Sequence, residues 1–183
     1  MKIVVGITGS SGAVYALDFL KKSTADKFLV ISKWGKALLK DELNMDEADL
    51  LPYVKRQFDN RDLTAPIASG SNFIDAVVIL PCSTSTIGKI ASGIGDSLIT
   101  RAAQVALKER YKLIICVRET PLSTLTLEQL TKLSGYGAII MPISSPLYFV
   151  PTSVDEYVGA FTDKVLAAIG EKRSNGWRSE ELQ

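Results

Sequence analysis

Hydroxyl-bearing side chains cluster directly after two apolar segments of the chain, and their number suits the binding of a phosphate. The turn Thr8-Gly9-Ser10-Ser11-Gly12 follows the first segment, and the run Ser83-Thr84-Ser85-Thr86 follows a later one and opens a predicted helix. One Ser or Thr is enough to cap a helix. The additional hydroxyls, with the free N–H groups at the start of each helix, favour a phosphate site over simple capping.

A mononucleotide suits such a site better than a dinucleotide. The first turn lacks the G-x-G-x-x-G spacing, and the second apolar segment ends in Ile31-Ser32-Lys33. Dinucleotide-binding folds place an Asp or Glu there to bind the ribose. Because a Gly/Ser turn is about as often a simple chain reversal, this interpretation depends on the other residues at the same edge.

Charged and aromatic residues follow or flank the remaining segments. The pair Arg118-Glu119 offers either an anion-binding group beside an acid or base, or an ordinary loop ion pair. Arg101 and Lys108 lie seven residues apart and share one face of a predicted helix, which by itself is typical of a solvated basic stripe. Tyr148 lies in a proline-rich loop, where it could cover the core or a flat ligand.

Composition excludes several classes of enzyme and partner. The chain has 183 residues and no histidine, which excludes Ser-His-Asp and Cys-His nucleophile systems and His-ligated zinc. Without a histidine to activate it, Cys82 is more consistent with the core than with catalysis. The formal charge of +1 gives no field for nucleic acid or an anionic membrane, and no metal-ligand cluster is evident.

The elements that must position these residues alternate in type, which predicts an α/β fold with a mostly parallel sheet. The predicted strands are Ile3–Ile7, Phe28–Ile31, Ala76–Leu80, Leu113–Val117 and Ala138–Met141. The predicted helices are Ala13–Lys22, Lys33–Leu43, Thr86–Ser92, Leu98–Arg110, Leu127–Leu133 and Val154–Ile169, and Asp46–Ser71 indicates a short helix followed by a loop. Because ligands bind beyond the carboxyl ends of parallel strands, we expect one site there for a phosphorylated, aromatic ligand.

The length suits a single domain, which we place at residues 1–170, followed by a polar tail at 171–183 that contains Trp177. Neither a signal-peptide core nor an apolar run of ~18 residues is present, which predicts a cytoplasmic protein without a membrane span. The mean hydropathy of +0.17 is high for a small monomer and favours a homo-oligomer.

Six short motifs resemble those of one family. They are Thr8-Gly9-Ser10-Ser11-Gly12-Ala13, Ile31-Ser32-Lys33, Pro81-Cys82-Ser83-Thr84-Ser85-Thr86, Arg101-Ala102-Ala103, Ala106-Leu107-Lys108-Glu109-Arg110 and Arg118-Glu119-Thr120-Pro121. In order and approximate spacing, from about Lys2 to Ile169, the chain resembles the flavin prenyltransferases, bacterial UbiX and fungal Pad1; the most specific block is 81–121. The resemblance implies a single-domain flavodoxin-like (Rossmann-like) three-layer sandwich that binds FMN. It also implies a homo-dodecamer with active sites at subunit junctions.

The resemblance further implies a reaction. In this family a dimethylallyl group moves from dimethylallyl monophosphate, or in some members the diphosphate, to N5 and C6 of reduced FMN without a metal. The product, prenylated FMN, serves a UbiD-type decarboxylase. Older names for such proteins, as aromatic-acid decarboxylases, describe the activity of that partner.

By position, the resemblance implies three groups of functional residues. FMN would contact Gly9, Ser10, Ser11, Ser32, Ser83, Thr84, Ser85, Thr86 and Arg118. The prenyl phosphate would contact Arg101, Lys108, Tyr148 and Lys164. Ser11, Glu42 and Glu119 would be the catalytic polar groups, although Glu42 is equally typical of a surface carboxylate.

Two rival functions are weighed against this one. Related flavoproteins that oxidatively decarboxylate peptidyl or pantothenoyl cysteine use a histidine and a Pro-x-Met-Asn segment, whereas this chain has no histidine and reads Met141-Pro142-Ile143-Ser144. A non-catalytic FMN carrier would need the Gly/Ser turn and the hydroxyl run, but not Arg101, Lys108, Glu119 or Lys164. The presence of all four favours the enzyme.

Overall fold

Six parallel strands form one sheet in the computed structural model, which describes residues 1–171 and Arg178. The strands are β1 (Lys2–Ile7), β2 (Asp26–Ile31), β3 (Arg56–Asp59), β4 (Ala76–Cys82), β5 (Lys112–Val117) and β6 (Ile139–Pro142). Their order is β3-β2-β1-β4-β5-β6. This is the doubly wound order of Rossmann-like folds, in which the ligand crevice opens at the carboxyl ends of the two central strands.

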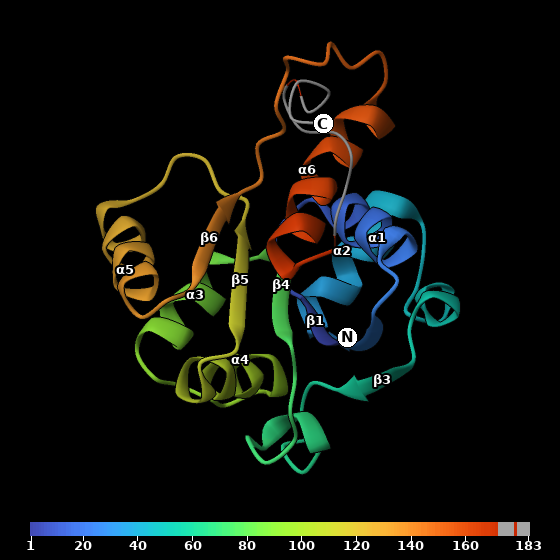
Figure 1. The fold of residues 1–183 in the computed structure, drawn as a ribbon. Helices are drawn as coiled ribbons and strands as arrows, with labels where there is room; N and C mark the ends of the chain where they lie inside the picture. Colours follow the sequence, from blue (N-terminus) through green and yellow to red (C-terminus); the bar gives the residue numbers. More distant parts are fainter. Residues whose placement is uncertain (172–177, 179–183) are drawn as a thin grey trace.

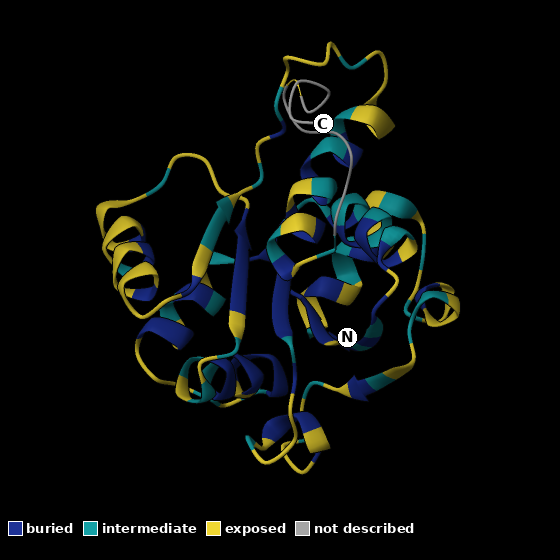
Figure 2. Ribbon diagram, viewed as in Figure 1, coloured by how far each residue is buried: buried dark blue, intermediate teal, exposed yellow. Residues whose placement is uncertain are grey.

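Two layers of helices cover the sheet. The α-helices are α1 (Ala13–Lys22), α2 (Lys33–Leu43), α3 (Thr84–Ala91), α4 (Leu98–Glu109), α5 (Thr124–Gly135) and α6 (Val154–Ile169). Helices α1, α2 and α6 pack on one face, and α3, α4 and α5 pack on the other (Figure 1). Figure 2 shows the central strands buried between these layers, and every residue of β4 is buried. The predicted single-domain α/β sandwich with a mostly parallel sheet is therefore confirmed, and the sheet is wholly parallel in its described pairings.

Strand β3 lies where the sequence analysis expected a loop, and that expectation is wrong. Arg56–Asp59 pairs in parallel with β2 at the edge of the sheet. Phe58 is the one residue of this strand that is both apolar and buried, because an edge strand has a neighbouring strand on one side only and is largely open to solvent. The strand therefore lacks the apolar pattern by which the others were predicted. The short helix expected earlier in this segment is present as a 3₁₀ helix, Ala48–Tyr53, and a second 3₁₀ turn spans Pro66–Ala68.

Serine side chains cap five of the six α-helices of the described chain. The caps are Ser32, Ser83, Ser97, Ser123 and Ser153, and each side chain accepts a hydrogen bond from the N–H group three residues further on. In α3, α4 and α5 that third residue is a threonine, so the pattern S-x-x-T marks three helix starts. A side-chain acceptor at this position satisfies one of the N–H groups that a helix leaves unpaired.

These caps explain where the predicted helix boundaries were wrong. Helix α3 begins at Thr84 rather than Thr86, because Ser83 already caps it. Helix α5 begins three residues earlier than predicted, directly after Ser123. Arg110, predicted inside α4, instead ends that helix with a φ of 62°.

The end of the described chain contacts the domain. The carboxylate of Glu171, the first residue of the predicted tail, accepts hydrogen bonds from the Ser23 hydroxyl (2.7 Å) and the Ala25 N–H (3.2 Å). The rest of that tail, including Trp177, lies outside the described residues apart from Arg178. Across residues 1–171 and 178, no helix combines the length and apolar character that a membrane span requires.

Candidate functional site

A cavity of about 230 Å³ lies at the carboxyl edge of the sheet, where the first turns of α2, α3 and α4 meet. Its lining residues are Thr8, Gly9, Ser32, Trp34, Asn60, Ser83, Ser85, Thr86, Lys89, Ser97, Ile99 and Thr100. Three of them, Ser32, Ser83 and Ser97, are helix N-caps. The partial positive charges of three helix N-termini therefore face one hydroxyl-lined space, which suits an anionic group.

Hydrogen bonds join the turn after β1 to the neighbouring strands. The Thr8 hydroxyl donates to the Pro81 carbonyl (2.9 Å) and accepts from the Ser83 N–H (2.8 Å). The buried Ser10 hydroxyl donates to the Arg118 carbonyl (2.7 Å). Both side chains thus fix the turn against the ends of β4 and β5, and contact between Ser10 and FMN stays a prediction.

Glu42 engages the N–H groups at the start of α1, which the sequence analysis expected to be free for a ligand. Its carboxylate accepts from the Gly12 N–H (2.9 Å) and the Ala13 N–H (2.8 Å). Gly12 has φ 116° and ψ 31°, a left-handed conformation that glycine adopts without strain. The side chain of Glu42 is exposed but fixed, so it is more than a solvated surface carboxylate.

Arg118 and Glu119 follow β5 beside this turn. The Nε of Arg118 donates to the Ser11 carbonyl (3.2 Å), while Oε1 of Glu119 accepts from the Thr120 N–H (3.0 Å). The structure therefore brings Ser11, Glu42 and Arg118 together around one turn, with Glu119 next in the chain. Hydroxyl, carboxylate and guanidinium groups can here hold an anion and exchange protons with a ligand.

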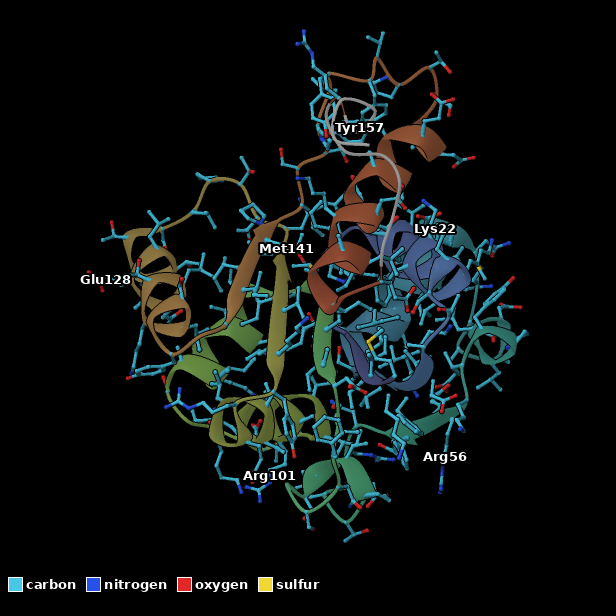
Figure 3. The ribbon with its side chains drawn as sticks, in the orientation of Figure 1. Lys22, Arg56, Arg101, Glu128, Met141 and Tyr157 are labelled. Atoms are coloured by element: carbon cyan, nitrogen blue, oxygen red, sulfur yellow. The ribbon has the colours of Figure 1, made fainter. Side chains whose placement is uncertain are left out.

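Arg101 and Lys108, on α4, are directed away from this turn in the described chain. The Nε of Arg101 donates to the Ala68 carbonyl (3.1 Å), and Lys108 pairs with Glu109. Figure 3 shows Arg101 at the opposite end of the molecule from Tyr157, which lies on α6. Neither Arg101 nor Lys108 lines the cavity.

Tyr148 and Lys164 lie near α6 instead. The Tyr148 ring packs edge-on against Phe149 at 6.0 Å, in the loop between β6 and α6, and Lys164 is exposed on α6 itself. This pair therefore does not meet Arg101 and Lys108 within one chain. The four residues assigned to the prenyl phosphate form a single site only if more than one subunit contributes.

The loop that carries Tyr148 is anchored at its base. The Ser145 hydroxyl donates to the Tyr157 carbonyl (2.5 Å) and also hydrogen-bonds Tyr15 on α1. Burial and the neighbouring Tyr157 raise the pKa of Tyr15, against the opposing effect of the Ser145 hydrogen bond. The Tyr15 ring also packs edge-on against Phe161 at 5.5 Å. The loop is thereby tied to both α1 and α6.

The cavity includes residues that the sequence analysis did not assign: Trp34, Asn60, Lys89, Ser97 and Thr100. The S-x-x-T pattern at 97–100 was a usable signal, because it marks the N-terminus of a helix. Lys89 follows Ser85 by four residues and so shares its helical face. Asn60 follows β3, a strand that the sequence pattern does not predict, so no sequence signal marks it as a site residue. In the structure its Oδ1 accepts a hydrogen bond from the Ile99 N–H at 3.1 Å.

Charge pairs and burial set the titration of groups near the site. Lys89 Nζ lies 2.7 Å from an Asp96 oxygen, and this hydrogen bond lowers the pKa of Asp96. A hydrogen bond from Arg61 lowers the pKa of Asp59, beside Asn60, to about 2. Complete burial raises the pKa of the Cys82 thiol, which agrees with the predicted core role.

Comparison with known proteins gives one consistent family. Residues 1–172 match the family model described as Flavoprotein. The chain is 44% identical over 171 residues to the flavin prenyltransferase UbiX of Thermoplasma acidophilum, an alignment that covers 93% of this chain and 95% of that protein.

Two solved structures resemble the fold closely and share more than a quarter of the sequence. AnUbiX (PadA1), in complex with FMN and dimethylallyl pyrophosphate, superposes with a TM-score of 0.90 at 32% identity, over 97% of this chain and 98% of that one. The dodecameric FMN-dependent UbiX-like decarboxylase of Escherichia coli O157:H7 gives a TM-score of 0.92 at 34% identity, over 97% and 99% of the two chains. The chain therefore belongs to the Flavoprotein family, and within it to the UbiX and Pad1 flavin prenyltransferases.

Proposed function

We propose that this protein is a flavin prenyltransferase, which moves a dimethylallyl group from dimethylallyl phosphate to N5 and C6 of reduced FMN. The proposal is carried by the convergence of the Ser-capped N-termini of α2, α3 and α4 on one cavity, in a chain 44% identical to a flavin prenyltransferase. Reduced FMN, when bound, supplies the nucleophilic atoms that take the prenyl group and becomes prenylated FMN.

The residues present fit FMN. No Asp or Glu is among the cavity-lining residues of the described chain, and the lining includes Lys89, whose ammonium group pairs with Asp96. Ser83 already caps α3, whereas no hydrogen bond within the described residues engages the Ser85 hydroxyl, which leaves it for a ligand. Hydroxyl and N–H donors of this kind bind a phosphate and a ribityl chain, so Ser32 and Ser83–Thr86 would hold that part of FMN. Gly9, Ser10, Ser11 and Arg118 would hold the rest.

Neighbouring subunits would complete the site for the prenyl donor. Arg101, Lys108, Tyr148 and Lys164 do not meet in one chain, and the Escherichia coli relative is dodecameric. We therefore propose a homo-oligomer, most simply a dodecamer, in which these cations face the phosphate of dimethylallyl monophosphate from different copies. Fixed cations stabilise the negative charge that develops on a leaving phosphate, and the Tyr148 ring would exclude water.

Glu42, Glu119 and Ser11 would move protons at the acceptor. Glu42 is fixed by two backbone N–H groups, and Glu119 stands beside Arg118 at the same edge of the sheet. General acid–base catalysis requires a proton-exchanging group within hydrogen-bond reach of the reacting atom, and the fixed position of the Glu42 carboxylate favours this.

The proposal also includes the setting of the reaction. Residues 1–170 would form the catalytic domain and 171–183 a peripheral tail. The protein would work in the cytoplasm, without a metal, and would supply prenylated FMN to a UbiD-type decarboxylase.

Mass spectrometry of the flavin tests this function directly. The protein is incubated anaerobically with reduced FMN and dimethylallyl monophosphate, and the flavin is then extracted. We expect a mass gain of one C5H8 unit. Unmodified FMN, with the diphosphate tested as a second donor and FMN shown to be bound, would contradict the proposal and support a flavin carrier.

The variant Glu119→Gln separates the enzyme from the carrier in the same assay. We expect a fall in turnover of at least about tenfold with FMN affinity unchanged, because the amide cannot exchange a proton as the carboxylate does. Unchanged turnover would rule out an essential acid–base role for Glu119.

A further inference from the structure

The geometry points to Trp34 as a positioning residue for the flavin ring: we propose that its indole contacts the isoalloxazine ring of bound FMN and sets the orientation of that ring. This inference rests on the proposed function, since it needs FMN as the ligand. It concerns a residue of α2 that lines the cavity beside Ser32 and that the family motifs quoted above do not include.

Two close contacts fix the base of the Trp34 side chain. A Cβ on Gly9 would lie 2.4 Å from the Cβ of Trp34, and a Cβ on Gly35 would lie 2.6 Å from the Ile7 carbonyl oxygen. Only glycine allows these approaches, so the first turn of α2 lies directly against the turn after β1. The direction in which the indole leaves the backbone is therefore set by packing before any ligand arrives.

The indole itself is largely open to solvent. Trp34 is 67% exposed although it lines a cavity, and Lys33 Nζ lies 5.4 Å from the centroid of its ring. Phe73, exposed to a similar extent at 61%, instead packs edge-on against Tyr111. A rigidly based aromatic face beside a hydroxyl-lined space suits a ligand that is flat and aromatic at one end and polar at the other.

FMN is such a ligand, because its ring system is flat and aromatic and its ribityl phosphate is polar. With the phosphate among the N-termini of α3 and α4, the ring would extend toward the open side of the cavity, where Trp34 stands. Ring stacking contributes modestly to affinity but strongly to orientation, so Trp34 would help present N5 and C6 toward Ser11 and the prenyl donor.

Binding of three ligands tests the contact: FMN, riboflavin and ribitol 5-phosphate, measured by calorimetry on the full-length protein. We expect Trp34→Leu to lower the affinity for FMN and for riboflavin about tenfold and to leave the affinity for ribitol 5-phosphate unchanged, because only FMN and riboflavin carry the ring. Trp34→Phe should stay close to the parent protein, and the matched control Phe73→Leu should bind all three ligands normally.

A second measurement does not depend on the leucine variant. In a Trp177→Phe background, Trp34 is the single remaining tryptophan, and FMN in contact with it should shorten its fluorescence lifetime to the picosecond range, while ribitol 5-phosphate should not. A lifetime that stays in the nanosecond range, or an equal loss of affinity for all three ligands, would overturn the inference. So would disassembly of Trp34→Leu with unchanged FMN affinity, which would assign the indole to a subunit interface. Failure of the parent protein to bind FMN would instead contradict the proposed function.

Discussion

The carboxylates of Glu42 and Glu119 stand at the same edge of the sheet but are fixed in different ways. Glu42 reaches from α2 to accept two N–H groups at the start of α1, whereas Glu119 accepts an N–H group of its own loop. Glu42 therefore couples two helices, and its removal affects both the fold and the proposed proton transfer. The two contributions can be separated by choosing the substitution.

Glu42→Gln keeps a side-chain oxygen for the N–H groups of α1 but removes the charge and the proton-carrying carboxylate. We expect FMN affinity to stay within about twofold of the parent and turnover to fall at least about tenfold. Single-turnover formation of prenylated FMN measures the second quantity. Full turnover in this variant would leave Glu42 as a helix cap alone.

Glu42→Ala serves as the structural counterpart, because it leaves the Gly12 and Ala13 N–H groups without their acceptor. Loss of a helix cap costs about 1 kcal/mol. We expect a lower melting temperature that acetate partly restores, since a free carboxylate can bind the vacated N–H groups.

Residues that directly follow strands could be predicted from the sequence, and others could not. Ser83 and Arg118 were found because a β-branched apolar run precedes each of them. Trp34 is the second residue of α2, and its place beside the cavity depends on tertiary packing against Gly9, which spacing does not reveal. Asn60 depends on β3, and an edge strand with one buried apolar residue has almost no hydrophobic pattern.

At the scale of elements, three helix starts share one motif but not one environment. Ser83 and Thr86 open α3, Ser97 and Thr100 open α4, and both pairs line the cavity. Ser123 and Thr126 open α5 with the same hydrogen bond, Thr126 N–H to Ser123 Oγ at 3.2 Å, but do not line it. The chain thus contains its own control for what a cap contributes to ligand binding.

Ser83→Ala, Ser97→Ala and Ser123→Ala should each lower stability by about 1 kcal/mol, because each loses the same capping bond. Only Ser83→Ala and Ser97→Ala should also lower the affinity for FMN, by roughly five- to tenfold, because each removes one hydroxyl near the phosphate. Thermal unfolding and FMN titration on the three variants measure both effects. Equal FMN affinity in all three would show that the hydroxyls at the cavity serve the helices only.

Helix boundaries were predictable where the apolar periodicity is clear. Helices α1, α2 and α6 span the residues that the apolar stripes predict, and serine caps mark the starts of α2 and α6. The predicted start of α3 is too late because the helix opens with Thr84-Ser85-Thr86, and that of α5 is too late because Thr alternates with Leu in its first turn, although Ser83 and Ser123 mark both starts. The cap is the stronger signal in these two helices.

At the scale of the whole molecule, α6 closes the fold by returning to the amino edge of the sheet. Glu171, just after α6, accepts hydrogen bonds from the turn between α1 and β2. The buried Lys27 lies nearby, and burial lowers its pKa while the charge of Glu171 opposes that shift. Fewer protons are bound by Lys27 in the folded state, so its contribution to stability rises as the pH rises toward the unfolded value of about 10.4.

Glu171→Gln should therefore destabilise the protein most at neutral pH, where Lys27 carries the charge that the carboxylate offsets. We expect a melting temperature lower by about 2–4 °C at pH 7, equivalent to about 1 kcal/mol. The difference should shrink as Lys27 loses its proton in alkaline solution. A constant difference between pH 7 and pH 10 would show that hydrogen bonds to Ser23 and Ala25 account for the whole effect.

Because Glu42 accepts hydrogen bonds from the start of α1, the two ends of the ligand crevice differ in charge, and this difference sets the orientation of a bound ligand. One helix N-terminus at this edge already has an anion supplied by the chain, while those of α3 and α4 open into the cavity. A ligand with one anionic end can bind in a single sense, with that end toward α3. A ligand with two anionic ends would set one of them against Glu42, and like-charge contact of this kind excludes competitors. The protein would thus select against molecules that share the flavin ring but carry negative charge at the wrong end.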